Sequence, residues 1–295
     1  MTEGEIDHRS LTERVIQFPL VTMLIALAIF IIIPGTVAGV LELGFRSYPV
    51  EGSTIISELL VAAAMVVVYK TFIRRLGARP RDDLVGPRAG AQTMAGIGTG
   101  ILLFTLIVGL AALLGVYRLQ GAGNVHFLIG ALIMDGIFPA VSEEILFRGI
   151  LFRWIEELAG SWPALILSSL LFGASHLANP HASMAAAIGI ALEGGLLLGG
   201  AYMLTRRLWF PMGLHAAWNV SQGEIFGIPV SGKPVEGLVR AQLTGPALLT
   251  GDGFGLEASP IAISIGTLFG IYLIIRAVRT GRLIKGGRPI PSISD

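Results

Sequence analysis

Three apolar stretches of this sequence each hold a pair of residues spaced four apart, with at least one polar member. The pairs are Glu144 with Arg148, Phe172 with His176, and His215 with Asn219, and Glu143 directly precedes the first pair. Residues four apart lie on one face of a helix, so each stretch presents its pair in a single direction. Charged groups inside apolar helices cost about 2.5–3.5 kcal/mol on insertion scales and mark functional sites by default. The pattern therefore predicts one site to which three helices contribute.

The residue types suit hydrolysis of a peptide bond. A carboxylate and an imidazole on facing helices can hold a water molecule, and a Glu in a poorly hydrated cavity is suited to act as a general base. Arg148 can pair with Glu144, and this leaves Glu143, about 100° around the helix, to face another helix. A His next to an Asn, as in the third pair, offers hydrogen-bond donors to an oxyanion.

The same donors could instead bind a metal ion that activates water. Its ligands would be Glu143, His176 and His215, although the local HExxH zinc pattern is absent. The sequence has no Cys, which excludes thiolate zinc sites, iron–sulfur clusters and cysteine nucleophiles. We predict no cofactor and keep zinc as the less favoured alternative.

The elements that would position these residues are membrane helices. Of the 295 residues, 53% are apolar and 14% are charged, and the mean hydropathy is +0.75. A soluble domain carries about 25% charged residues, so the composition indicates a multi-pass protein of the cell membrane. The net charge of +1 gives no electrostatic case for nucleic acid as a partner. We predict an all-α bundle of about eight transmembrane helices, at roughly 19–43, 54–69, 95–116, 127–141 with a long continuation, 162–177, 182–204, 208–222 and 260–277.

The distribution of basic residues predicts the orientation. With eight spans, most of the 21 Lys and Arg residues fall on the side that carries both termini, which the positive-inside rule assigns to the cytoplasm. The first apolar stretch is too long for a signal peptide and is expected to be the first membrane helix. Counting from the cytoplasmic ends of the helices, we expect the site to open toward the cytoplasmic half.

The chain divides into five segments by composition. The first segment is a cytoplasmic tail (1–18), and the second holds the variable helices one to three (19–125) with a basic loop (70–94). A core of helices four to seven follows (126–222). The last two segments are an outer Gly- and Pro-rich loop (223–259) and a last helix with a basic tail (260–295). The basic loop is expected to be a solvated, topology-setting segment, with contact to anionic lipid as the alternative. The outer loop is equally compatible with a lid, a re-entrant element and a plain surface loop.

The three motifs resemble the signature of the CPBP family of intramembrane proteases, which includes the CAAX prenyl endopeptidases of the Rce1 type and bacteriocin-processing proteins. That signature is EExxxR, FxxxH and HxxxN, each on its own helix, and here it occurs in the same order within residues 126–222. The resemblance implies that Glu143 is the base that activates water and that His176 shares this water. It implies an oxyanion site at His215 and Asn219. It also implies supporting roles for Glu144, Arg148 and Phe172.

The resemblance favours an endopeptidase that acts on peptides or membrane proteins, with the lipid bilayer as its surroundings. Nothing in the sequence indicates a prenyl-binding groove or an oligomeric state. A transporter remains an alternative, because Asp135 and Glu193 extend the polar path of the motif residues. A non-catalytic scaffold or immunity factor is the other. The roles of Asp135, Glu193 and Glu58 stay open.

Overall fold

The computed structural model describes residues 10–78, 80–124 and 128–286 and shows a polytopic helical membrane protein. Within these ranges six helices are long and apolar enough to cross a membrane: Pro19–Phe45, Gly52–Arg75, Ala89–Leu113, Ser161–Ala178, Met184–Thr205 and Pro260–Arg279. The two other predicted spans are helical but fall short of that criterion. The span predicted at 127–141 with a long continuation is interrupted by π-helical turns, and the span predicted at 208–222 is short. Both lie in the centre of the bundle.

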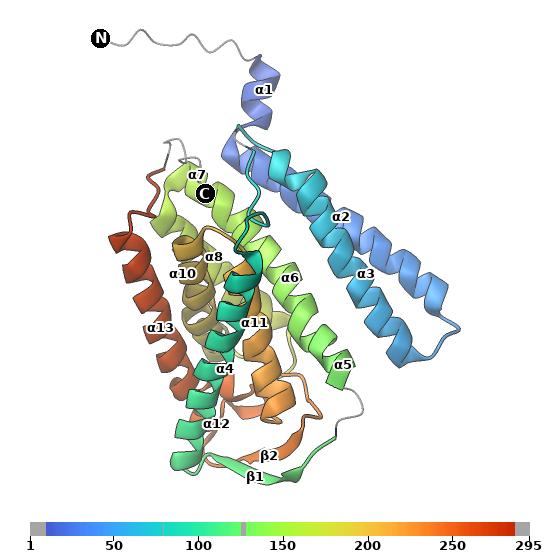
Figure 1. Cartoon of the computed structure of the whole chain (residues 1–295), viewed down its shortest axis with the longest axis vertical. Helices are drawn as coiled ribbons and strands as arrows, with labels where there is room; N and C mark the ends of the chain where they lie inside the picture. Colours follow the sequence, from blue (N-terminus) through green and yellow to red (C-terminus); the bar gives the residue numbers. More distant parts are fainter. Residues whose placement is uncertain (1–9, 79, 125–127, 287–295) are drawn as a thin grey trace.

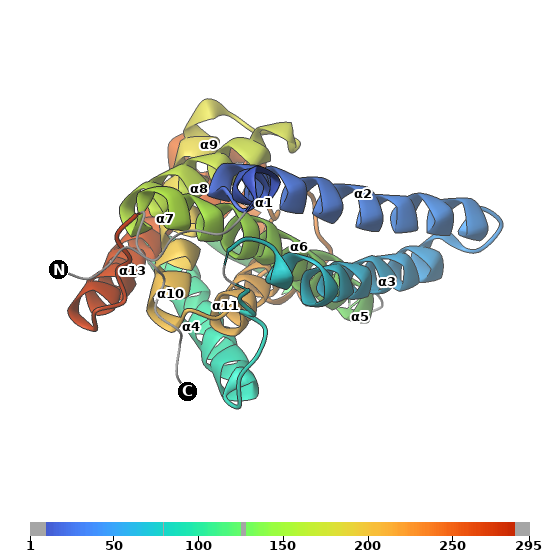
Figure 2. The ribbon, with the colours of Figure 1, turned by 90° about the horizontal axis from the view of Figure 1, so that it is seen from above.

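The first two long helices form a hairpin that stands apart from the rest of the bundle. After the short helix α1 (Leu11–Ile16), α2 (Pro19–Phe45) and α3 (Val50–Thr71) run antiparallel, and η1 (Ile73–Arg75) follows. Figures 1 and 2 show the free end of this hairpin pointing away from the other helices. Along α2 only Thr22, Ala26, Phe30 and Pro34 are buried, one face at a spacing of four. The remaining apolar surface is what a lipid-facing helix presents.

The central bundle is held by very close helix contacts. Helix α4 (Ala89–Leu113) packs along α11 (Trp209–Val220), and α10 (Leu196–Thr205) packs along α13 (Pro260–Arg279). A Cβ atom on Gly96 would lie 2.3 Å from the carbonyl oxygen of Phe210, so the first contact requires glycine. Small residues let membrane helices approach in this way, because lipid offers no hydrophobic driving force.

One continuous helical segment runs through the middle of the bundle from residue 128 to residue 159. It consists of α5 (Leu128–Ala131), the π-helical turn η2 (Leu132–Ile137), α6 (Phe138–Glu144), the π-helical turn η3 (Ile145–Phe152) and α7 (Arg153–Ala159). The predicted long continuation of the fourth helix is therefore confirmed, while Phe127 lies outside the described residues. π turns inside α-helices are frequent at functional sites.

The neighbouring helices complete the core. Helix α8 (Ser161–Ser175) ends in η4 (His176–Ala178), and α9 (Met184–Ile190) continues through the π turn η5 (Ala191–Gly195) into α10. Helix α11 continues as the π turn η6 (Ser221–Ile225). The outer loop then contains α12 (Ala247–Thr250), η7 (Asp252–Phe254) and η8 (Leu256–Ala258).

The expectation of a purely α-helical chain was wrong in one place. Strand β1 (Tyr117–Ala122) pairs antiparallel with β2 (Val239–Leu243), with an irregularity between Leu119 and Gly121. Both strands do alternate apolar and polar residues, over Tyr117–Gln120 and Val239–Leu243, but each run is so short that the alternation is a weak signal beside the long apolar stretches. Their pairing fixes the outer loop against the connection that follows α4.

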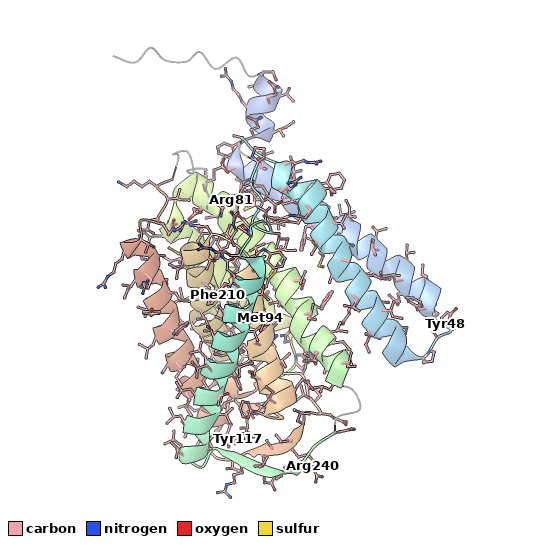
Figure 3. All side chains as sticks on the ribbon, viewed as in Figure 1. Tyr48, Arg81, Met94, Tyr117, Phe210 and Arg240 are labelled. Atoms are coloured by element: carbon pink, nitrogen blue, oxygen red, sulfur yellow. The ribbon has the colours of Figure 1, made fainter. Side chains whose placement is uncertain are left out.

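The two ends of the bundle differ in what they carry. The end we call proximal carries α1 and the start of α8, where Gly160 pairs with Lys285. The distal end carries β1 and β2 (Figure 1). Figure 3 shows Arg81 toward the proximal end and Tyr117 and Arg240 at the distal end.

Candidate active site

A fully buried ion pair forms the base of the site. Glu144 and Arg148 are both 0% exposed, and the guanidinium donates from Nη1 to Oε1 of Glu144 at 2.9 Å. From Nη2 it also donates to the carbonyl oxygens of Gly194 at 3.4 Å and Gly195 at 3.3 Å. The predicted pairing is therefore present, and it links the central helix to the π turn η5.

His215 completes this cluster from helix α11. Its Nδ1 lies 2.9 Å from the same Oε1 atom of Glu144, so the carboxylate orients the imidazole ring. The other ring nitrogen, Nε2, lies 3.9 Å from Oε2 of Glu143. A ring held by a carboxylate on one nitrogen presents its second nitrogen in a fixed direction.

His176 is fixed by a different mechanism at the end of α8. Its Nδ1 lies 2.8 Å from the carbonyl oxygen of Phe172, and its ring centroid lies 4.8 Å from that of Phe172. Because a carbonyl only accepts, Nδ1 carries the hydrogen and Nε2 is left with a free lone pair. The Phe172 ring also faces the His215 ring, at 6.1 Å, and the Arg148 guanidinium, at 4.7 Å. Phe172 is thus the apolar centre around which the polar groups pack.

Glu143 differs from its neighbour in sequence. Its side chain is 30% exposed, and its Oε2 atom is buried without a hydrogen-bond partner among the described residues. The divergence of the two carboxylates predicted from the helix geometry is present: Glu144 faces the ion pair and Glu143 faces open space. A carboxylate oxygen without a partner is available to a ligand or a water molecule.

Asn219 lies one helical turn beyond His215. Its side-chain nitrogen donates to the backbone oxygen of Asp135 at 3.0 Å. An amide nitrogen has two hydrogens, so one donor remains for another acceptor.

These side chains line a single cavity of about 210 Å³. Glu143, His176, His215, Asn219 and Phe172 all contribute, as do the three residues whose roles the sequence left open, Glu58, Asp135 and Glu193. The structure therefore brings together the three motifs, while Glu144 and Arg148 lie behind the cavity wall.

The cavity lies nearer the distal end, which corrects the expectation of an opening in the half that carries the termini. Helix α8 begins at Ser161, beside Lys285, and its 15 residues extend about 22 Å before His176. The outer loop covers this end of the cavity with Val230, Ser231, Lys233 and Glu257. Of the alternatives for the outer loop, a plain surface loop is the one the structure does not support.

Glu257 is the site residue that the sequence did not single out. It is 2% exposed, and its Oε1 accepts from the Ser231 backbone N–H at 2.5 Å. Burial raises the pKa of this carboxyl to about 7, although the Ser231 amide opposes the shift. Its sequence context, a Gly-rich loop, gave no periodic signal, and only its position just before the last helix could have drawn attention to it.

A metal site is not preformed by these residues. Among residues 10–78, 80–124 and 128–286, no three His, Cys, Asp or Glu side chains are grouped so as to hold an ion. We therefore derive no step through a metal.

Two comparisons with known proteins bear on this site. Residues 124–221 match the family model described as type II CAAX prenyl endopeptidase Rce1-like. Residues 124–221 belong to this family. All three motifs fall inside the matched segment, so the predicted family relationship is confirmed.

The Rce1-like segment also has a named relative. The chain is 28% identical over 123 residues to the "Putative membrane peptidase YdiL" of Bacillus subtilis (strain 168), which covers 42% of this chain and 46% of that protein. The chain thus spans less than half the length of this relative. Several cavity residues lie outside the Rce1-like segment, namely Glu58, Val230, Ser231, Lys233 and Glu257.

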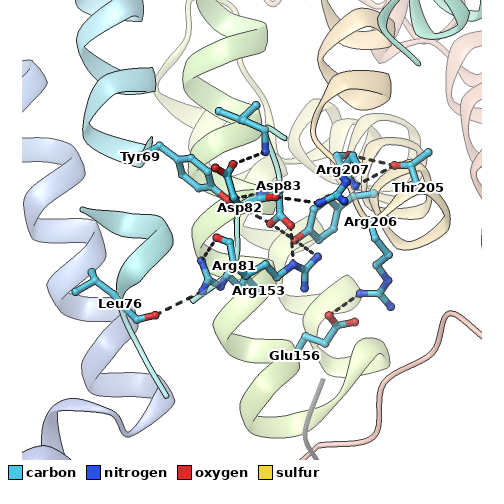
Figure 4. A network of polar contacts seen from close by, with 12 residues as sticks. Tyr69, Leu76, Arg81, Asp82, Asp83, Arg153, Glu156, Thr205, Arg206 and Arg207 are labelled. Carbon is cyan, nitrogen blue, oxygen red and sulfur yellow. Dashed lines mark hydrogen bonds and ion pairs between the residues drawn. The ribbon is translucent and has the colours of Figure 1, made fainter. Parts of the chain in front are cut away.

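A second buried polar cluster lies at the proximal end of the Rce1-like segment (Figure 4). Asp83, 0% exposed, accepts from Arg81 Nε at 2.6 Å and from the hydroxyl of Tyr202 at 2.8 Å. Glu156, also fully buried, accepts from Arg206 at 2.6 Å and from Ser161 at 2.5 Å. The basic loop 70–94 is therefore not simply solvated, because residues 81–84 dock onto the helices. Asp83 raises the pKa of Arg81 above its ordinary value, against the opposing effect of burial, so this arginine stays charged.

Proposed function

We propose that this protein is an intramembrane endopeptidase that hydrolyses peptide bonds by means of water activated by Glu143. The observation that carries the proposal is the pair of Glu143 and His215 facing one cavity. Oε2 of Glu143 has no hydrogen-bond partner among the described residues, and Nε2 of His215 lies 3.9 Å from it. The family of residues 124–221 supports the same reaction class.

The water molecule would be held between Glu143 and His176. The free lone pair on Nε2 of His176 accepts one hydrogen of the water, and the Glu143 carboxylate accepts the other. As the water oxygen attacks the scissile carbonyl carbon, Glu143 takes the proton. When the C–N bond breaks, this proton passes to the leaving amine, so protons and charge balance.

The oxyanion would be stabilised from helix α11. In its protonated form Nε2 of His215 is a donor, and Glu144 supports that form from the other side of the ring. Asn219 offers the second hydrogen of its amide, while the first holds the Asp135 backbone. Arg148 keeps Glu144 in place, so these two residues position the donor rather than touch the substrate.

We further propose eight spans with both termini in the cytoplasm, and the five-segment division given above. The central helix 128–159 and the helix 209–225 would be the two spans that complete the count. The cavity would then lie in the outer half of the membrane. Peptide or membrane-protein substrates are the class that this position favours.

The orientation is directly testable because the sequence has no Cys. Single replacements Arg88→Cys at the proximal end and Arg118→Cys at the distal end place one thiol on each side of the membrane. In intact cells a membrane-impermeant maleimide is expected to label only the distal thiol. Labelling of the proximal thiol alone would reverse the proposed orientation.

The activity is tested with purified protein in nanodiscs. Wild type and Glu143→Ala are incubated with a mixed peptide library, with and without a chelator, and new termini are read by mass spectrometry. We expect new termini from wild type only, in the presence of chelator as well. Equal cleavage by both proteins would refute the role of Glu143, and loss of cleavage with chelator would refute the metal-independent mechanism.

A further inference from the structure

The cavity carries more carboxyl groups than basic side chains. Its described lining holds five carboxyl groups but a single Lys or Arg, the exposed Lys233; the acids are Glu58, Asp135, Glu143, Glu193 and Glu257. Lys233 acts electrostatically on Glu58 and Asp135, on one side of the cavity. Glu193 and Glu257 repel each other, and His215 is the basic group that acts on Glu257.

Glu193 is a buried carboxyl without a partner. It is 3% exposed, and no hydrogen bond to its side chain is present among the described residues; Oε2 in particular is buried and unpaired. Leaving a buried polar group unsatisfied costs about 1–3 kcal/mol, and more when the group is charged. It lies in the π turn η5, where one extra residue turns a side chain inward. The fold thus retains a costly group that faces the cavity.

The surroundings of Glu193 leave room for its carboxyl. Gly266 of helix α13 lies behind it, where a Cβ atom would be 3.0 Å from Cβ and 3.1 Å from Oε2 of Glu193. The absence of a side chain at residue 266 therefore creates the space that the carboxyl occupies.

The π turn η5 also places Glu193 close to the proposed catalytic residues. Its neighbour Gly194 accepts a hydrogen bond from Arg148, and a Cβ atom on Gly194 would lie 3.0 Å from the Phe172 ring. That ring contacts both His176 and His215. A group bound at Glu193 would therefore lie close to the bond being cleaved.

We propose that Glu193, with Glu257 nearby, forms a subsite that binds a positively charged Lys or Arg side chain of the peptide substrate. The inference rests on the proposed endopeptidase function. A cationic side chain brings the N–H donors that Glu193 lacks and offsets the repulsion between the two carboxyls. A metal ion fits less well, because the described residues do not group three ligands around one point.

The subsite predicts a preference for basic residues at one position near the scissile bond. The test first locates that position with a library that varies each position of a cleaved peptide. Three peptides are then compared that carry Lys, norleucine or Glu there. A hydrogen-bonded charge is worth about 1.5–3 kcal/mol, so kcat/KM for the Lys peptide should exceed that for norleucine by about 10- to 100-fold.

The variant Glu193→Gln keeps the shape of the side chain but removes its charge. The Lys-to-norleucine ratio is expected to fall toward one in this variant and to fall in Gly266→Ala, where the added methyl group would press against Cβ and Oε2 of Glu193. It should stay unchanged in the control Glu236→Gln, an exposed loop residue outside the cavity lining. Gly266→Ala keeps the test decisive if Glu193→Gln does not fold.

The outcomes separate this inference from the proposed function. Cleavage without a basic preference, or a preference that survives Glu193→Gln, overturns the subsite while leaving the protease intact. If no peptide is cleaved, the proposed function fails, and equilibrium binding of the Lys and norleucine peptides decides the subsite. Binding of the Lys peptide about tenfold or more tighter, lost in Glu193→Gln, supports it. Equal affinities overturn it.

Discussion

Glu144 and Glu156 are buried carboxylates on the same helical segment, and their surroundings differ. At the proximal end, both oxygens of Glu156 are bonded, one to Ser161 and one to Arg206. At the cavity, one oxygen of Glu144 serves both Arg148 and His215, while Oε2 of Glu144 and Oε2 of Glu143 have no described partner. A buried carboxylate with both oxygens bonded mainly fixes structure, whereas one with an unbonded oxygen leaves a group for a ligand. The comparison assigns stability to the proximal cluster and chemistry to the cavity.

The replacement Glu143→Gln should have the largest effect, and this effect should be on activity rather than on stability. It removes the general base, a contribution typically worth 10²–10⁴-fold in rate, so kcat should fall by about that factor. The midpoint of thermal unfolding in detergent should stay at or above that of wild type. Oε2 of Glu143 is buried without a hydrogen-bond partner, and Gln places no negative charge there. A lower midpoint with proportionate loss of activity would instead show that Glu143 stabilises the fold.

The replacement Glu156→Ala should give the reverse result. It leaves Arg206, 3% exposed, as a buried charge without its carboxylate, which costs about 3–5 kcal/mol in unfolding free energy. Activity per folded molecule should change little, since the proximal cluster does not line the cavity. Thermal unfolding and activity titrated against folded protein measure both quantities, with Glu42→Ala, an exposed side chain, as the control.

The pH dependence of stability offers a further test of the cavity. The pKa of Glu257 is raised by burial from 4.5 to about 7, so the folded state binds this proton more tightly than the unfolded state. The unfolding free energy should therefore fall as pH rises from about 4.5 to 7, by up to about 3 kcal/mol. Glu257→Gln should remove most of this slope. An unchanged slope in Glu257→Gln would contradict the burial argument.

The replacement Glu144→Gln sharpens the comparison, because Glu144 belongs to the incomplete cluster yet holds an ion pair. A Gln can still accept from Arg148 or His215 but carries no charge. We expect a loss of about 10- to 100-fold in kcat, since this residue acts through His215, with a destabilisation of about 1–3 kcal/mol. The pH profile of kcat should shift as the His215 ring loses its carboxylate. A stability loss with an unaltered profile would leave Glu144 a purely structural role.

The prediction of membrane helices from the sequence succeeded where composition decides it. The long apolar runs of α2, α4 and α13 could satisfy their backbone only as helices in lipid, so their existence followed from hydropathy. The π turns and the paired strands did not follow, because both depend on contacts with distant segments. The side to which the site was expected to open was wrong for the same reason: counting residues gives a distance from a helix end but not the segment that covers the other end.

Residue spacing determined which side chains share a helix face, and so indicated the three motifs and the divergence of Glu143 from Glu144. That information is local, because a helix fixes directions over one or two turns. Only the tertiary structure decided that Glu193 and Glu257 face the cavity, that the outer loop covers it, and that residues 81–84 dock at the proximal end. Those facts depend on how helices cross and where loops fold back, and no local pattern encodes them. The motif residues could therefore be predicted from the sequence, whereas the full set of residues that line the cavity could not.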